Sequence, residues 1–167
     1  EVVFLARIGL RSGSGGSTSV SPQENGVSRL DLDMTEMKNL FDNNLLTNES
    51  IDLILDRSGA AFEHNPQAAI AYVAALGSKL SDNYGDSYAG RFVPRFEQIG
   101  HTFAGGSVGQ CSDIHFAMLK AYKQLVGPNA HAYLVNFQTA GDLQHTNLII
   151  EDQGKINVID YGNVSQN

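Results

Sequence analysis

The chain has 167 residues, of which 42% are hydrophobic and 17% charged, and its 18 acidic and 11 basic residues give a net charge of −7. This length predicts a single domain over residues 1–167. The acidic balance argues against a partner that is nucleic acid or anionic lipid, and no apolar run approaches the roughly 18 residues of a membrane span. A single cysteine excludes an intrachain disulfide and a multi-cysteine zinc site.

The first 100 residues are expected to combine a strand, a loop and a helical part. Residues 2–8 are apolar and predict a short buried strand. Residues 11–28 are rich in Ser, Gly, Thr and Asn, which indicates a surface loop. The glycines of this loop do not form a phosphate-binding motif, so we assign no ligand to it.

Helices are expected to follow this loop. Asp33 and Glu36 resemble a capping box, which predicts that the first helix begins at Asp33. A second helix is expected to begin at Asn48. A third is expected over 66–80, with Pro66 in its first turn, where the missing N–H costs nothing. Residues 81–100 are expected to be irregular, with some helix around 86–98.

Residues 101–167 are expected to form the catalytic core. An apolar stripe predicts a helix from Cys111 to Val126, ended by Gly127 and Pro128. Helices followed by consecutive antiparallel strands predict an α+β fold, in which the helix that carries the cysteine packs on a small antiparallel sheet. The three expected strands, with a turn at Gly154 between the last two, are 130–137, 144–150 and 156–161.

Cys111 is the strongest candidate for a reactive residue. The N-terminus of a helix carries a partial positive charge and free N–H groups, which favour the thiolate that acts as a nucleophile. The same N–H groups suit an oxyanion that develops on a carbonyl substrate. Gly105, Gly106 and Gly109 precede the cysteine and permit close approach of a substrate backbone.

A thiol nucleophile needs a base and a group that orients the base. His145 lies on the second expected strand and Asp160 near the end of the third. A turn at Gln153 and Gly154 makes them near cross-strand neighbours, whose side chains can touch. We therefore expect the sulfur of Cys111 to face His145, with Asp160 on the opposite side of the imidazole.

These residues resemble the transglutaminase-like branch of the papain-type superfamily. The resemblance is carried by Gly109-Gln110-Cys111, by His145-Thr146-Asn147 and by the segment that ends at Asp160, and it covers residues 105–162. The family orders its triad as Cys on a helix N-terminus, His on one strand and Asp on the next. The resemblance implies a papain-like core and a Cys111, His145 and Asp160 triad without cofactor or metal.

Departures from the family pattern direct the expected reaction toward hydrolysis. Ser112 follows the cysteine where transglutaminases usually have Trp, and the chain has no Trp. Small polar residues at 112, 146 and 147 offer no aromatic tunnel for an amine. We therefore expect a thiol hydrolase that cleaves peptide, isopeptide or glutamine amide bonds of a protein or peptide substrate. Gln98 or Gln110 is a candidate for the side chain of the oxyanion hole, and Asn147 for a supporting residue.

Other interpretations of the same residues remain open. An amine-transferring transglutaminase and an inactive, transglutaminase-like protein-binding module are the alternatives. Cys111 and His115 lie four residues apart on a helix, as metal ligands often do, with His101, His131 or His145 as further candidates. The composition fits a secreted or periplasmic domain, with a cytoplasmic one left open. The oligomeric state is also open, and His101 is placed near the mouth of the site.

Overall fold

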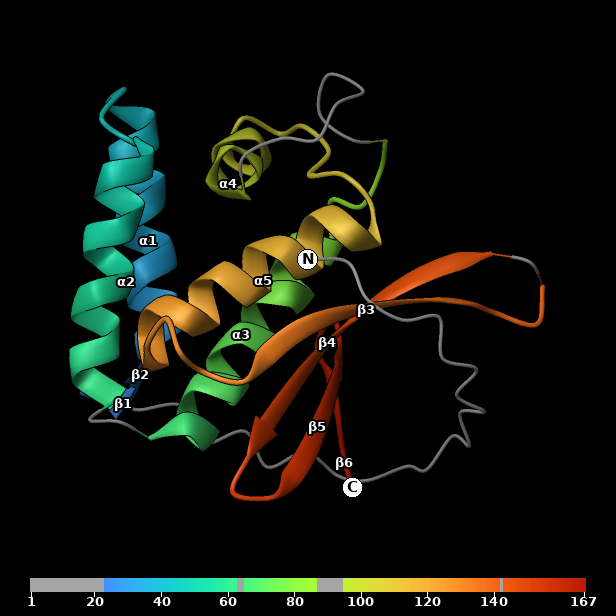
Figure 1. Cartoon of the computed structure of the whole chain (residues 1–167). Coiled ribbons are helices and arrows are strands. Elements are labelled where there is room, and N and C mark those ends of the chain that lie inside the picture. Colours follow the sequence, from blue (N-terminus) through green and yellow to red (C-terminus); the bar gives the residue numbers. More distant parts are fainter. Residues whose placement is uncertain (1–22, 63–64, 87–94, 142) are drawn as a thin grey trace.

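A computed structural model describes residues 23–62, 65–86, 95–141 and 143–167, and shows an α+β architecture (Figure 1). The predicted strand at 2–8 lies outside the described residues. Two short strands, β1 (Gln23–Glu24) and β2 (Val27–Ser28), form a hairpin within the predicted loop.

The first helix begins four residues earlier than predicted. Helix α1 spans Arg29–Asp42, because Ser28 is the N-cap and its hydroxyl accepts from the Asp31 N–H at 3.2 Å. Asp33 is therefore not the start of the helix but a buried residue within it. Helices α2 (Asn48–Phe62) and α3 (Pro66–Ser81) begin where the sequence predicts.

The helix expected around 86–98 is described only in its last part. Helix α4 spans Arg95–Phe103 and extends past the expected end at residue 98. Residues 87–94 lie outside the described part of the chain. Helix α5 spans Cys111–Val126, with Gly127 as its C-cap, as predicted. In Figure 1 it runs across α3, with its first turn toward the side to which the β3–β4 hairpin projects.

The sheet contains one strand more than the sequence predicts. Its antiparallel order is β3 (Ala132–Gln138), β4 (Gln144–Asp152), β5 (Lys155–Asp160) and β6 (Asn163–Gln166). The turn at Gln153 and Gly154 joins β4 to β5 with positive φ at both residues, as a two-residue hairpin requires. Tyr161 and Gly162 turn the chain again directly after Asp160. The sequence pattern does not predict this turn or the strand β6 that follows it.

The core lies between the helices and one face of the sheet. Leu148 and Ile150 of β4 and Ile159 of β5 are inaccessible to solvent and join the same cluster as the buried face of α5. Within the described residues no helix is long and apolar enough to cross a membrane.

A buried carboxylate joins the first three helices. Asp33 of α1 has no exposed surface and accepts from Arg29 Nη2 at 2.9 Å and from the Tyr72 hydroxyl of α3 at 3.2 Å. Arg57 of α2 donates to it at 3.3 Å, and the Ser58 hydroxyl also bonds to it. Burial, and then the charge of Asp33, raise the pKa of Tyr72 well above its ordinary value. Asp33 thus satisfies polar groups of all three helices within the core.

Replacing this carboxylate tests its importance. Asp33→Asn removes the buried negative charge that Arg29 and Arg57 share, so we expect the free energy of unfolding to fall by about 3–5 kcal/mol. The matched control is Asp42→Asn on the same helix. Asp42 forms a half-exposed ion pair with Lys38, and the loss of this ion pair lowers the free energy of unfolding by less than about 1 kcal/mol. Urea unfolding followed by circular dichroism measures both. Equal losses in the two variants would contradict the role given to Asp33.

Candidate functional site

Cys111 is the first residue of α5 and is half-buried. The turn before it is shaped by Asp113, whose Oδ2 accepts from the Gln110 N–H at 2.9 Å. Gly109 lies against this carboxylate with φ of +102°, and a Cβ there would be 2.5 Å from Asp113 Oδ2. Gly109 is therefore required both by its backbone conformation and by the space that Asp113 occupies.

The loop before Cys111 is held against the end of α3. The Val108 N–H donates to the Asn83 carbonyl at 3.0 Å, and the Gly85 N–H donates to the Gly109 carbonyl at 3.1 Å. These two bonds run in opposite directions on either side of Tyr84. They bring Tyr84 from the middle of the chain beside Cys111.

His145 and Asp160 form a hydrogen-bonded pair. His145 Nε2 lies 2.8 Å from Asp160 Oδ1, and their side chains are 21% and 43% exposed. The register that pairs Leu148 with Ile159 makes His145 and Asp160 diagonal rather than direct cross-strand neighbours. Since a carboxylate accepts, Nε2 carries the proton, and Nδ1 keeps the lone pair that accepts a proton from a thiol.

The thiol of Cys111 is hydrogen-bonded to a residue that sequence reasoning did not assign to this role. Its Sγ lies 3.9 Å from Thr146 Oγ1, and the Thr146 hydroxyl donates to Asn136 Oδ1 at 2.6 Å. Within the described residues no hydrogen bond joins this sulfur to His145. The strand that carries the imidazole therefore also carries the partner of the thiol, one residue along. Only the register of β3 and β4, which pairs Asn136 with Thr146, reveals this chain of contacts.

His115 lies one helical turn after Cys111 and is completely buried. Its Nδ1 is 2.7 Å from the Cys111 carbonyl, and its Nε2 accepts from the Tyr161 N–H at 3.1 Å. Burial lowers the pKa of His115, against the raising effects of the Cys111 carbonyl and Asp160. Because both ring nitrogens have partners, His115 is not a base for the thiol.

Aromatic rings from distant parts of the chain surround this cluster. The Tyr161 ring lies 4.8 Å from the His115 ring and 5.7 Å from the His145 ring, and Tyr84 packs edge-on against Tyr161 at 6.3 Å. Burial, followed by the Cys111 side chain, raises the pKa of both tyrosines. Phe137 covers another side of His145 at 5.5 Å. The sequence stretches that resemble the transglutaminase-like family gave no indication of Tyr84 or Phe137.

The other residues that the sequence suggested for the site differ in their location and burial. Gln110 is exposed at the N-cap, and Gln98 is buried in α4. The Asn147 side chain is buried, and its Oδ1 has no hydrogen-bond partner. His101 of α4 packs against Gly106 so closely that a Cβ there has no room. His101 thus borders the loop that precedes Cys111, in line with its predicted place near the site.

The described residues do not bring together the ligands that the alternative of a metal site requires. Over residues 23–62, 65–86, 95–141 and 143–167, no group of three or more His, Cys, Asp or Glu side chains is placed to hold an ion. His131 lies 3.8 Å from Glu151 with most of its side chain exposed. His115 is committed to main-chain groups, so its spacing from Cys111 does not form a ligand pair.

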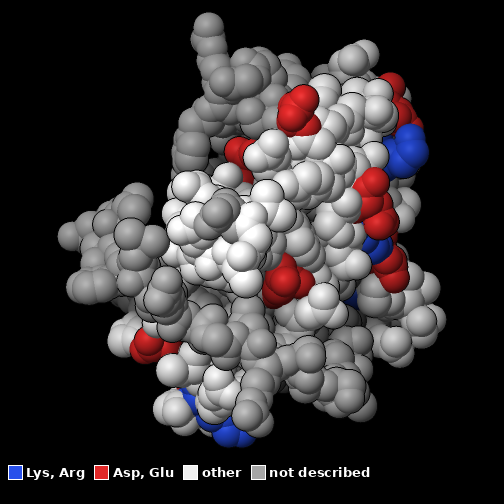
Figure 2. Space-filling view, turned by 90° about the vertical axis from the view of Figure 1, so that its right-hand side faces the viewer, with Lys and Arg blue, Asp and Glu red and all other residues white. Residues whose placement is uncertain are grey.

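Carboxylates are scattered over the described surface on the side of the molecule shown in Figure 2, and Lys and Arg side chains lie toward its edges. This distribution is compatible with a neutral or basic substrate and unfavourable for a phosphate-rich one.

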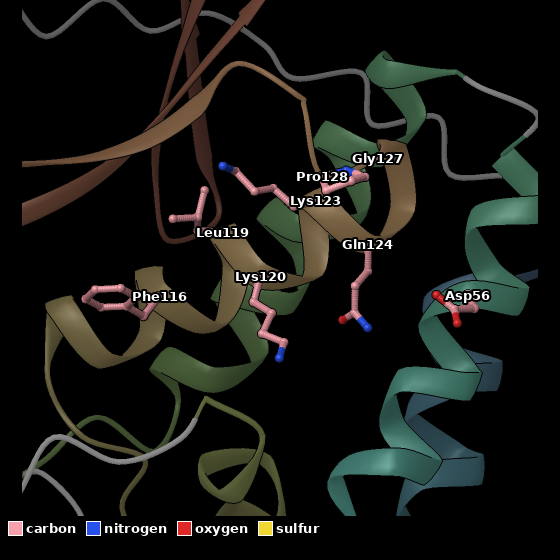
Figure 3. A pocket seen from close by; sticks show the side chains of 8 residues that line it. All are labelled: Asp56, Phe116, Leu119, Lys120, Lys123, Gln124, Gly127 and Pro128. Atoms are coloured by element: carbon pink, nitrogen blue, oxygen red, sulfur yellow. The ribbon is translucent and has the colours of Figure 1, made fainter. Parts of the chain in front are cut away.

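A separate hollow of about 480 Å³ lies along α5, away from its first turn (Figure 3). Gln124 extends from α5 and donates to Asp52 of α2 at 2.7 Å, and Asp56 of α2 lies across the gap. Lys120 stacks on the Phe96 ring, 5.2 Å from its centroid. None of Cys111, His145 and Asp160 lines this hollow, so we do not assign the reaction to it.

Two glycine substitutions test how the loop shapes the site. Gly105 and Gly109 both have positive φ, but only at Gly109 does a Cβ meet another residue. We expect Gly105→Ala to cost about 1 kcal/mol of backbone strain. Gly109→Ala adds overpacking against Asp113 of about 1–3 kcal/mol and slows alkylation of Cys111. Urea unfolding and iodoacetamide labelling measure the two effects, and equal behaviour of the two variants would contradict this account.

No protein-family model matches the chain, and neither a curated protein nor a solved structure gives a match to it. The functional assignment therefore depends on the geometry of the chain's own residues.

Proposed function

We propose that the protein is a cysteine-dependent acyl-transfer enzyme of transglutaminase-like type that hydrolyses peptide, isopeptide or glutamine amide bonds. The observation that carries this proposal is the 2.8 Å contact between His145 Nε2 and Asp160 Oδ1. A histidine held by a carboxylate at Nε2 presents an unprotonated Nδ1, which is the form that a general base requires. Thr146, the next residue of the same strand, contacts the Cys111 thiol.

The first half of the reaction forms a thioester. The Cys111 thiol turns from Thr146 toward His145 Nδ1 and gives up its proton, and the sulfur attacks the amide carbonyl carbon. The N–H groups of the first turn of α5 stabilise the oxyanion, and the Cys111 N–H must exchange its bond to Tyr84 for this role. His145 then protonates the leaving nitrogen, the C–N bond breaks, and the amine departs. Such hydrogen bonds commonly tighten only when substrate binds.

The second half returns the enzyme to its starting state. His145 takes a proton from water, and the hydroxide attacks the thioester. The C–S bond breaks, His145 returns the proton to the Cys111 sulfur, and the carboxylic acid departs. Asp160 holds the imidazole and stabilises its charged form in both halves. The half-exposed Tyr84 and Asp160 leave the surroundings of the thiol open to water, which supports hydrolysis over transfer to an amine.

The alternatives differ in the fate of the acyl group. A transglutaminase transfers the same acyl group to an amine, and a binding module forms no thioester. The contact between the thiol and Thr146 is the observation that favours the binding module, because it leaves the sulfur bonded to a neutral hydroxyl rather than to the imidazole.

Thiol reactivity tests the nucleophile without knowledge of the substrate. We expect Cys111 to react with iodoacetamide at pH 7 much faster than the same thiol in the urea-unfolded chain. His145→Gln removes the base and should slow the reaction about 100-fold. Asp160→Asn should have a smaller effect, since the amide still holds the ring.

The control for this experiment is His131→Gln, which replaces an exposed histidine and should leave the rate unchanged. Cys111→Ala should show no labelling, with an unchanged circular dichroism spectrum. A native thiol that reacts no faster than the unfolded one would contradict the enzyme and support the binding module.

The acyl acceptor is tested by competition. The protein is incubated with glutamine-bearing peptides, with and without a dansylated amine, and the products are followed by mass spectrometry. We expect the hydrolysed product to dominate, because the exposure of Tyr84 and Asp160 leaves the site open to water, and we expect none with Cys111→Ala. Dominant incorporation of the amine would overturn hydrolysis in favour of a transglutaminase with the same three residues.

A further inference from the structure

We propose that His115 is a positioning residue that holds Asp160 in place for His145 through its hydrogen bond to the main chain of Tyr161. This inference rests on the proposed function and adds a residue outside the Cys111, His145 and Asp160 set. His115 is fully buried, is four residues from Cys111 along α5, and touches the end of the strand that carries Asp160.

The tautomer of His115 follows from its two partners. The Tyr161 N–H can only donate, so Nε2 of His115 must accept and carries no proton. The Cys111 carbonyl can only accept, so Nδ1 carries the proton and donates. A neutral ring therefore links the first turn of the helix that bears the nucleophile to the sheet.

The bond to Tyr161 fixes a strained point of the backbone. Asp160 pairs with Asn163, so Tyr161 and Gly162 form a two-residue turn in which Tyr161 has φ of +51°. This conformation is unfavourable for a residue with a large side chain. The His115 ring supports it twice, through the hydrogen bond at 3.1 Å and through contact with the Tyr161 ring at 4.8 Å.

Asp160 immediately precedes this strained residue, so its carboxylate direction depends on the turn. The His115 ring also lies edge-on to the His145 ring at 6.1 Å and fills the space behind the imidazole and its carboxylate. Loss of the acceptor at Nε2 releases the Tyr161 N–H and lets the turn relax, which moves Asp160 relative to His145. A displacement of about 1 Å at a reacting group can reduce a rate about 100-fold.

Substitution of His115 by Gln or Asn distinguishes a hydrogen-bonding role of its ring from a role in packing alone. Gln is long enough to bring an acceptor oxygen near the place of Nε2, whereas Asn reaches only the place of Nδ1. We expect His115→Gln to keep the alkylation rate of Cys111 within about tenfold of the wild type, and His115→Asn to lower it about 100-fold. Near-ultraviolet circular dichroism establishes that each variant is folded.

The pH dependence supplies a second measurement that does not need the Asn variant to fold. Protonation of His115 turns Nε2 into a donor that opposes the Tyr161 N–H. The groups that act on the ring are the main chain of Cys111 and Ile159, the side chains of Asp160 and His145, and the Tyr161 ring. Since burial lowers the pKa of His115, this loss of the link occurs below the ordinary histidine range near 6.5. In His115→Gln this ionisation is absent, so the labelling rate should fall less steeply below pH 6.5 than in the matched His131→Gln.

The outcomes distinguish the two proposals. A native Cys111 that reacts no faster than the unfolded thiol overturns the proposed function. If the native thiol reacts fast but at the same rate in His115→Gln and His115→Asn, the role of His115 is overturned and the triad is left intact. The same conclusion follows if the labelling rate falls equally steeply below pH 6.5 in His115→Gln and His131→Gln. Rescue by Gln together with the shallower acid limb supports it.

Discussion

Helix α5 is enclosed by α2, α3, α4 and the sheet, and this burial fixes the position of its first residue. Ile114, Ala117 and Met118 have no exposed surface. A glycine of α3 permits part of this contact, since a Cβ at Gly77 would lie 2.5 Å from Met118 Sδ. A helix held this tightly over its length cannot shift along its axis without opening voids in the core. Cys111 is thus placed by packing that occurs well away from it.

The site combines two rigid bodies through polar contacts at one end of the sheet. The sheet contributes the hydrogen-bonded pair of His145 and Asp160, and the helix contributes the thiol. Thr146 and His115 bridge them, one through the sulfur and the other through main-chain groups. In the structure the thiol is bonded to a neutral hydroxyl, and the proposed attack requires the sulfur to leave Thr146 and reach His145.

Much of the helix and strand pattern was predictable, because local signals agreed with the tertiary structure. Gly127 and Pro128 mark the end of α5, and Gln153 and Gly154 set the hairpin that brings His145 close to Asp160. The predicted start of α1 was wrong, because Asp33 resembles a cap locally and is recruited into the core by residues distant in sequence, among them Arg57.

The residues that contact Cys111 could not be predicted from their spacing in the sequence. Asn136 reaches Thr146 only through the cross-strand register, and Tyr84 arrives beside Cys111 through main-chain bonds between two loops. Neither relationship leaves a periodic signal. The role of His115 was likewise hidden, since a histidine four residues after a cysteine suggests metal binding until both of its ring nitrogens are seen to face main-chain groups.

The close sequence separation of His145 and Asp160 has a consequence for the order of folding. They belong to one hairpin with a two-residue turn, and such local elements form within microseconds. Cys111 joins them only when α5 docks, and that docking closes a longer loop of chain. The His145–Asp160 pair therefore needs only local closure of the chain, whereas its approach to Cys111 needs the docking of a helix distant from it in sequence.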